Sequence, residues 1–228
     1  AISAERFSRV LALAAQHEAL YAALGMHPIV IEEHTDEGLA QLEALMAQRP
    51  PKLVAVGEIG LDLYRDDPQF DRQQALLEAQ LRLAKRYDLP VILHSRRTHD
   101  KLAMLLKKYA LPRTGVIHGF AGSLQQAERF VQLGYKIGVG GTITYPRASK
   151  TREVMARLPL SALLLETDAP YLLPRDLKPK PASRRNEPAY LPHILASVAA
   201  WRGEEAQWLE AQTDANVRAL FGVDINGV

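Results

Sequence analysis

A buried strand that ends at acidic residues is the feature that most constrains how this chain can fold. Residues 53–62 read Leu-Val-Ala-Val-Gly-Glu-Ile-Gly-Leu-Asp. Four apolar residues thus run into Gly57 and Glu58, and Gly60 allows the backbone to leave the strand in a tight turn. A carboxylate directly after such a run lies at the carboxyl end of a strand, where α/β proteins assemble their sites. We therefore expect a parallel sheet with Glu58 at the edge that carries the chemistry.

Three further apolar runs end in a polar side chain in the same way. They are residues 89–96, 115–122 and 163–170, which reach His94, His118 and Asp168 respectively. Together with Glu58, the four strand ends offer two carboxylates and two imidazoles, which are the ligand types of a divalent metal site. A single histidine at a strand end is as often a buried hydrogen-bonding residue. Four candidates at four successive strand ends favour the metal site.

Amphipathic segments with helical periodicity separate these strands throughout, so the sequence predicts six strand–helix units spaced roughly 20 to 40 residues apart. Such alternation is typical of a parallel sheet covered by helices. Polar ends of non-adjacent strands converge on one point only if the sheet closes, so we expect a TIM-type (β/α)8 barrel. A doubly wound open sheet is the alternative, but no Gly-x-Gly-x-x-Gly phosphate motif follows an early strand. The barrel is expected to be one domain over residues 1–228.

Composition restricts the protein class. With 228 residues and 47% hydrophobic content, the chain can bury a sizeable core. No run approaches the roughly 20 apolar residues that span a bilayer, and the start of the sequence lacks a signal peptide pattern. Zero cysteines exclude thiolate ligands and disulfides, which suits a cytoplasmic enzyme. The net charge of +2 is too small to indicate nucleic acid by itself.

Cationic and imidazole side chains near the strand ends are candidates for binding a substrate. Arg96 follows His94 by two residues, where a guanidinium can bind a phosphate with two hydrogen bonds. His27 ends an earlier strand within residues 20–28, although His-Pro is also a common way to enter a loop. Residues 174–188 carry five basic and two acidic side chains directly after the strand of Asp168. The alternative for this segment is a solvated loop stiffened by proline.

Five short motifs resemble, in the same order, the signature motifs of the TatD-type DNases. They are Gly57-Glu-Ile-Gly-Leu-Asp62, His94-Ser-Arg96, His118-Gly-Phe120, Glu166-Thr-Asp-Ala-Pro170 and Arg185-Asn-Glu-Pro188. This family consists of metal-dependent hydrolases of the amidohydrolase superfamily with a TIM barrel, and the resemblance covers the whole chain.

The resemblance implies hydrolysis of phosphodiester bonds with divalent metal ions, Mg²⁺, Mn²⁺ or Zn²⁺, two of them in the intact protein. It implies metal-ligand roles for four residues and substrate contacts for four more. The ligands would be Glu58, His94, His118 and Asp168; the substrate residues would be His27, Arg96, Arg185 and Asn186. We expect the two carboxylates to be catalytic, with Glu58 bridging two metal ions and Asp168 accepting a proton from water.

One departure from the family pattern concerns the start of the sequence. Members of the family usually begin with a strand that carries His-x-His, followed by a helix and a second strand, and these 228 residues contain none of these. Two such strands added to the six would complete an eight-stranded barrel. We therefore expect the first two barrel strands, and with them part of the metal site, to be missing from this sequence.

Three functions are compatible with these residues. The first is a deoxyribonuclease that cleaves single strands or ends of DNA, since a barrel mouth admits a strand more readily than a duplex. The second is a metal-dependent hydrolase of a small ester, an amide or an aminoacyl-tRNA. The third is a metal-depleted binding protein. The basic segment 174–188 favours DNA as the substrate. Nothing in the sequence indicates a membrane or an obligate protein partner.

Overall fold

The computed structural model describes residues 1–223 and divides the chain into two compact units. The first unit comprises Ala1–Gly115 and residues 218–223, and the second comprises Val116–Val217. The chain contains six parallel strands separated by helices, as the sequence predicts. The expected single domain over residues 1–228, the closed barrel and the two missing strands stay predictions.

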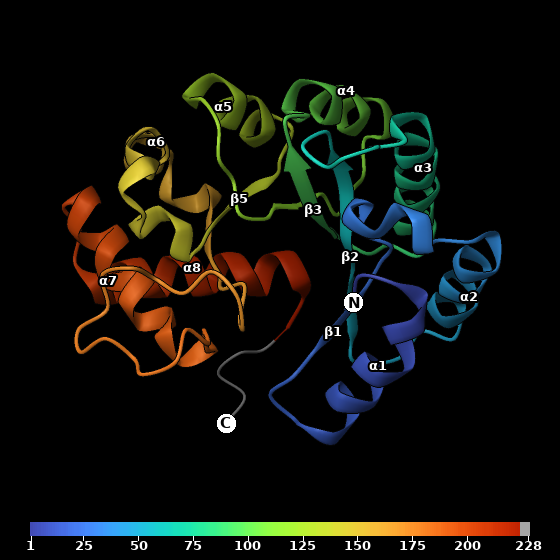
Figure 1. Ribbon diagram of the computed structural model, residues 1–228, viewed down its shortest axis with the longest axis horizontal. Helices are drawn as coiled ribbons and strands as arrows, with labels where there is room; N and C mark the ends of the chain where they lie inside the picture. The colour runs from blue at the N-terminus through green and yellow to red at the C-terminus, as the bar shows by residue number, and fades with distance from the viewer. Residues whose placement is uncertain (224–228) are drawn as a thin grey trace. The chain divides into compact units, whose positions relative to one another are not determined.

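The first unit is built around the long strand β2, which pairs in parallel with β1 on one side and β3 on the other. Its elements are η1 (Ala4–Arg6), α1 (Phe7–Gln16), β1 (Ala22–Leu24), η2 (Pro28–Glu33), α2 (Asp36–Ala47), β2 (Leu53–Asp62), α3 (Phe70–Arg86), β3 (Val91–Arg96) and α4 (His99–Tyr109). Helix α3 packs against β2, and α4 packs against β3 and α3 (Figure 1). Strand β2 is buried for most of its length, as expected of a strand covered on both faces.

The second unit has β5 between β4 and β6, again in parallel. Its elements are β4 (Gly115–Ile117), α5 (Leu124–Gln132), β5 (Lys136–Val139), η3 (Gly141–Thr144), η4 (Pro146–Ala148), α6 (Ser149–Arg157), η5 (Leu160–Ala162), β6 (Leu163–Leu165), η6 (Pro188–Tyr190), α7 (Leu191–Arg202) and α8 (Ala206–Phe221). Helix α5 begins with a capping box, in which Ser123 and Gln126 satisfy each other's backbone N–H groups. It ends before Gly134, whose φ of 93° stops the helix.

Two elements differ from the sequence-based expectation. The Asp67-Pro68 pair is a typical helix start, yet α3 begins only at Phe70. Asp67 and Gln69 have left-handed φ angles of 44° and 46°, so helical winding cannot begin before them. From Pro188 onward the sequence predicts a helical segment to Phe221, but Gly203 interrupts it, because it adopts a φ of 65° and separates α7 from α8.

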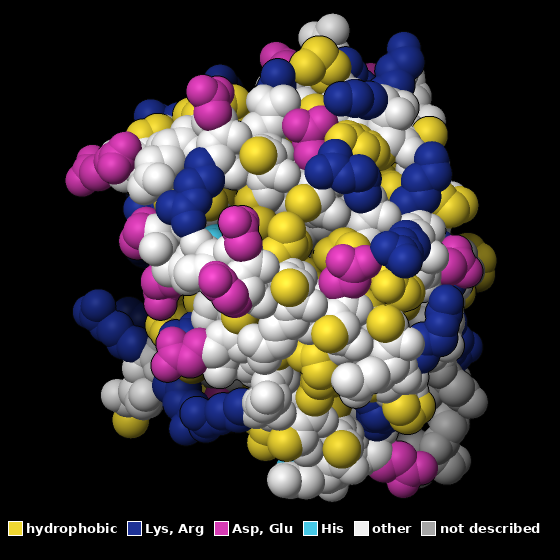
Figure 2. All heavy atoms as spheres, turned by 90° about the vertical axis from the view of Figure 1, so that its right-hand side faces the viewer, with side chains coloured by type: hydrophobic (Ala, Val, Ile, Leu, Met, Phe, Trp, Pro, Cys, Tyr) yellow, Lys and Arg dark blue, Asp and Glu magenta, His cyan; other side chains and the backbone are white. Residues whose placement is uncertain are grey.

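The outer helical face of the first unit carries interspersed charges of both signs. Figure 2 shows Lys and Arg side chains among Asp and Glu side chains on this face. Two of the basic residues form surface ion pairs, Arg86 with Glu43 at 2.7 Å and Lys108 with Glu78 at 3.1 Å. Arg86 on α3 and Lys108 on α4 are therefore part of a solvated surface with charges of both signs. Within residues 1–223, no helix is long and apolar enough to cross a membrane.

Candidate metal and active site

Three side chains of the first unit gather near the carboxyl ends of its strands. His27 lies three residues past the end of β1, whereas Glu58 lies inside β2, which continues for four more residues to Asp62, and His94 lies inside β3, two residues before its end. The Oε2 atom of Glu58 lies 3.3 Å from Nε2 of His27 and 3.4 Å from Nδ1 of His94. One ligand atom from each of the three residues lies within 4.8 Å of the others, and His27 is buried while the other two are half-buried. Oε2 of Glu58 and Nδ1 of His94 suit a divalent cation in chemistry and in spacing, and His27 lies beside them in the same cluster.

Two glycines let β2 approach β3 closely at this cluster. Gly60 pairs with His94 in the strand register and has a φ of 151°, a conformation that side chains rarely adopt. A Cβ atom at Gly57 would come within 2.6 Å of the Ile92 side chain, and one at Gly60 would overlap the His94 backbone. Both glycines are therefore required for Glu58 and His94 to face each other.

His94 is oriented by a second carboxylate. Its Nε2 atom lies 2.7 Å from Oδ2 of the buried Asp62, so Nδ1 remains directed at Glu58. Burial alone would lower the pKa of His94, but the hydrogen bonds to Asp62 and Glu58 and their charges outweigh it and raise the pKa to about 9. A carboxylate that holds one imidazole nitrogen while the other faces a metal site is a common arrangement. Asp62 thus fixes the orientation of the His94 ring.

Two buried glutamines of α3 fix the backbone at the ends of β1 and β2. The amide of Gln73 accepts from N–H of Asp62 at 2.8 Å and donates to its carbonyl at 2.9 Å. Seven residues further along the same helix, the amide of Gln80 pairs with both backbone groups of Met26 at 2.8 Å and 3.3 Å. Each glutamine replaces the backbone partner that a strand end lacks, so α3 sets the positions of His27 and Asp62.

His27 has a different hydrogen-bonding pattern from His94. Its Nδ1 atom accepts the backbone N–H of Ile29 at 3.0 Å, so the proton of the neutral ring lies on Nε2, which faces Glu58. The ring therefore donates a hydrogen bond toward the cluster. His34, itself buried, donates from Nε2 to the carbonyl of His27 at 2.7 Å and holds this segment in place. Such a donor suits the expected role of His27 in binding substrate oxygen atoms.

The second unit contains a corresponding histidine with two carboxylates. Nδ1 of His118 lies 2.7 Å from Oε2 of Glu166, and Nε2 contacts Oδ1 of Asp168. The backbone N–H of Gly119 donates to the other oxygen of Glu166. A Cβ atom at Gly138 would overlap the Glu166 carboxylate, so this glycine makes room for it. Glu166 orients His118 as Asp62 orients His94.

Of the sequence-predicted metal ligands, the structure brings Glu58 and His94 together in one unit and His118 and Asp168 together in the other. The convergence of all four on one metal site stays a prediction. Sequence reasoning missed Asp62 and Glu166 as site residues, although both lie within the motifs that were singled out. The sequence did offer one signal for them, because each is an acidic residue in the same motif as a candidate ligand.

The candidate substrate residues occupy different environments. Arg96 is the last residue of β3 and is exposed, and Arg185 is exposed in the loop after β6. Asn186 is 1% exposed, its amide donates to the carbonyl of Tyr171 at 2.9 Å, and it accepts from N–H of Glu187. Arg96 and Arg185 are thus accessible to a ligand, whereas the Asn186 side chain holds its loop together. A substrate contact of Asn186 stays a prediction.

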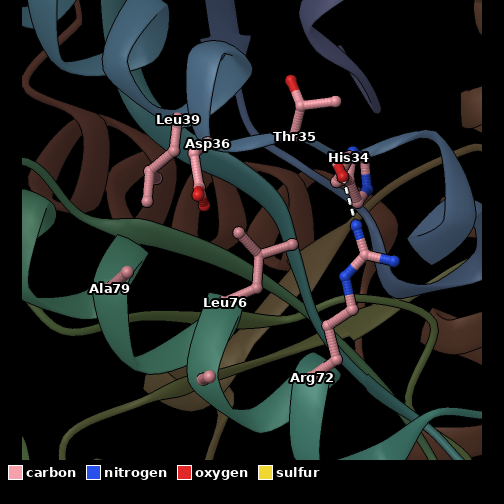
Figure 3. A pocket seen from close by; sticks show the side chains of 8 residues that line it. His34, Thr35, Asp36, Leu39, Arg72, Leu76 and Ala79 are labelled. Carbon is pink, nitrogen blue, oxygen red and sulfur yellow. Dashed lines mark hydrogen bonds between the residues drawn. The ribbon is translucent and has the colours of Figure 1, made fainter.

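A separate groove of about 480 Å³ lies between α2 and α3 of the first unit (Figure 3). Leu39, Leu76 and Ala79 form apolar walls, with Asp36 beside Leu39 and Arg72 on the other side, next to His34. The guanidinium of Arg72 donates to the backbone carbonyl of His34. Arg72 therefore supports the segment that follows His27, and none of the candidate metal ligands lines this groove.

The sequence and the fold match known proteins over nearly the whole chain. Residues 1–222 match the family described as TatD related DNase. The chain is 61% identical over 223 residues to the "Uncharacterized metal-dependent hydrolase YjjV" of Escherichia coli strain K12, covering 98% of this chain and 85% of that protein. It is 50% identical over 219 residues to the "3'-5' ssDNA/RNA exonuclease TatD" of Klebsiella pneumoniae strain 342, covering 95% and 82%.

Solved structures agree with these relatives. The crystal structure of YjjV from Escherichia coli superposes with a TM-score of 0.93 over 98% of this chain and 85% of that one. An amidohydrolase from Saccharomyces cerevisiae, only 19% identical, has a TM-score of 0.84 over 96% and 86% of the two chains. The second likeness concerns the fold alone.

Proposed function

The chain belongs to the TatD-related DNase family of metal-dependent hydrolases, and we propose that it hydrolyses phosphodiester bonds of DNA, on single strands or at strand ends. The observation that carries this proposal is a pair of histidines whose rings are already oriented by neighbouring carboxylates. His94 and His118 each have one nitrogen held by a carboxylate and the other directed at a candidate ligand, Glu58 or Asp168. Such prearrangement is expected of metal ligands and has no use in a metal-depleted binding protein.

The ions would be held by Glu58, His94, His118 and Asp168. When bound, divalent metal ions lower the pKa of water and offset the negative charge that develops on a phosphodiester. Asp168, whose side chain is 33% exposed, is reached by water and would accept the proton of the attacking water molecule. His27 would donate from Nε2 to a phosphate oxygen, and Arg96 would bind a neighbouring phosphate. Together, these residues would activate the attacking water molecule, offset the negative charge on the phosphodiester and orient the substrate.

The relatives support the choice of a single-stranded substrate. The Klebsiella pneumoniae protein, half identical to this chain, is named an exonuclease of single-stranded DNA and RNA. The exposed basic side chains after β6 also favour a polyanion over a small neutral ester. Hydrolysis of a small ester, an amide or an aminoacyl-tRNA remains the second function to be tested, because the same metal ligands would serve it.

The test is direct assay with added Mg²⁺, Mn²⁺ or Zn²⁺. Single-stranded oligonucleotides labelled at either end, a duplex of the same sequence and p-nitrophenyl acetate would be incubated separately with the protein. We expect metal-dependent shortening of the single strands, slower cleavage of the duplex and no metal-dependent ester hydrolysis. Ester hydrolysis without cleavage of nucleic acid would contradict the proposal and favour the second function.

Charge removal in the loop after β6 should change how binding depends on salt. Lys178 and Lys180 are exposed there, and replacing both by Ala should weaken binding of a single-stranded oligonucleotide. Each lost phosphate contact should reduce the slope of log K against log salt by about 0.7. The matched control is the double replacement of Lys107 and Lys108, which lie exposed on α4. Equal slopes for the two double variants would show that the loop is merely solvated.

A further inference from the structure

An exposed aromatic ring lies next to the Glu58–His94 cluster, with two arginines against it. Tyr64 follows β2 by two residues and is 53% exposed. The guanidinium carbon of Arg96 lies 3.6 Å from the centre of its ring, and that of Arg97 lies 4.6 Å away. Both arginines are exposed, and neither forms a salt bridge among the described residues. Their charges are therefore available to an anionic ligand.

The Tyr64 backbone is held by the carboxylate that orients His94. Oδ1 of Asp62 accepts the N–H of Tyr64 at 2.8 Å, while Oδ2 of the same group bonds Nε2 of His94 at 2.7 Å. The intervening Leu63 donates its N–H to the carbonyl of Arg96 at 3.1 Å. One buried carboxylate thus fixes the place of the ring relative to a candidate metal ligand.

The turn that carries the two arginines is also anchored. Arg97 adopts a left-handed φ of 59°, an uncommon conformation for a non-glycine residue. The next residue, Thr98, is buried and donates from its hydroxyl to the carbonyl of Leu61 at 3.2 Å. The hydroxyl of Ser95 lies 2.8 Å from that of Thr98. Arg96 and Arg97 therefore leave the sheet from a backbone that is tied to β2.

We propose that Tyr64, Arg96 and Arg97 form a stacking platform for one nucleobase of a single strand whose phosphodiester lies at the Glu58–His94 cluster. The inference rests on the proposed function and adds a base-binding subsite to it. Binding of phosphate alone explains the arginines, but it does not explain an aromatic ring that is more than half exposed beside the cluster. Stacking on an aromatic ring is independent of base identity, and adjacent arginines neutralise the flanking phosphates.

The platform also predicts a preference for single strands. Bases in a duplex are stacked on one another and paired, so a base reaches Tyr64 only from a single strand or a frayed end. Tyr21 offers a useful contrast, because it is also exposed and has the ammonium of Lys52 4.5 Å from its ring centre. It directly precedes β1 and so lies at the amino end of that strand, away from the cluster. Both tyrosines are thus exposed and lie next to a cation, but of the two, Tyr64 is the one near the candidate ligands.

The test compares binding of two single strands to the full protein in the presence of a chelator, which prevents hydrolysis. One strand is a 12-mer of thymidine, and the other is a 12-mer of base-free tetrahydrofuran residues with the same phosphates. Stacking contributes about 1–3 kcal/mol per base, so Tyr64→Leu should weaken binding of the thymidine strand about 5- to 150-fold. Tyr64→Phe should bind it like the wild type, and all three proteins should bind the base-free strand equally.

Tyr21→Leu is the matched control and should bind both strands like the wild type. Equal affinity of wild type and Tyr64→Leu for the thymidine strand would overturn the platform, and so would equal losses in Tyr64→Leu and Tyr64→Phe. If the wild type cleaves the thymidine strand with added metal while either of these results is found, the proposed function stands and the subsite fails. If no strand is cleaved with any metal, the proposed function fails whatever Tyr64 binds.

Discussion

Replacing Asp168 by Ala is expected to lower the turnover of a single-stranded oligonucleotide by about 10²- to 10⁴-fold, the usual contribution of a positioned general base. The side chain contacts Nε2 of His118 and is exposed enough for water to reach it. Glu58→Ala should cause a loss of similar size, because its Oε2 lies within 3.4 Å of both His27 and His94. Initial rates at saturating metal, with the fold checked by circular dichroism, measure both effects.

The control for this prediction is Glu153→Ala. Glu153 lies on α6 of the same unit as Asp168, is 66% exposed and pairs with Arg157 at 3.2 Å, so its removal takes away a carboxylate that belongs neither to the candidate ligands nor to the loop after β6. Activity close to that of the wild type is expected. Full activity of Asp168→Ala would remove this residue from the mechanism, and full activity of Glu58→Ala would do the same for Glu58.

The strands and most of their polar ends could be predicted from the sequence because buried parallel strands leave a strong local pattern. Runs of apolar residues bounded by glycine or proline located β2 and β3, and Glu58 and His94 face each other as expected from their places at the strand ends. The later start of α3 could not be predicted in this way. Left-handed angles at Asp67 and Gln69 override the Asp-Pro signal, and the Gln73 amide donates a hydrogen bond to the carbonyl of Pro68, which lies between them.

The distinction between ligand and orienting carboxylate was beyond sequence reasoning. Asp62 and Glu166 are the same residue types as the candidate ligands and lie in the same motifs, so only the direction of each side chain separates the roles. The buried glutamines Gln73 and Gln80 were missed for a similar reason. Their polar side chains are typical of a solvated helix face although their spacing places them on the buried face with Leu77, and only the structure shows the strand ends that their amides complete.

Stability of the metal-free protein should depend on the ionisation of His94. Its pKa is about 9 in the folded protein and near 6.5 without partners, so the folded state binds the proton more tightly than the unfolded state does. The resulting stabilisation is fully present below pH 6.5 and is lost as the pH rises through about 9. By the size of this shift, the loss should be about 3 kcal/mol in the free energy of unfolding.

Urea unfolding in a chelator from pH 6 to 9.5, compared between wild type and His94→Gln, measures this loss. The difference between the two proteins should shrink as the pH rises, whereas His17→Gln, at an exposed position outside the cluster, should follow the wild type. A difference that stays constant over this range would show that the carboxylates do not hold the proton on His94. A metal ligand must be unprotonated, so saturating metal should reverse the trend, and the stabilisation that the metal supplies should grow from pH 6 to 9.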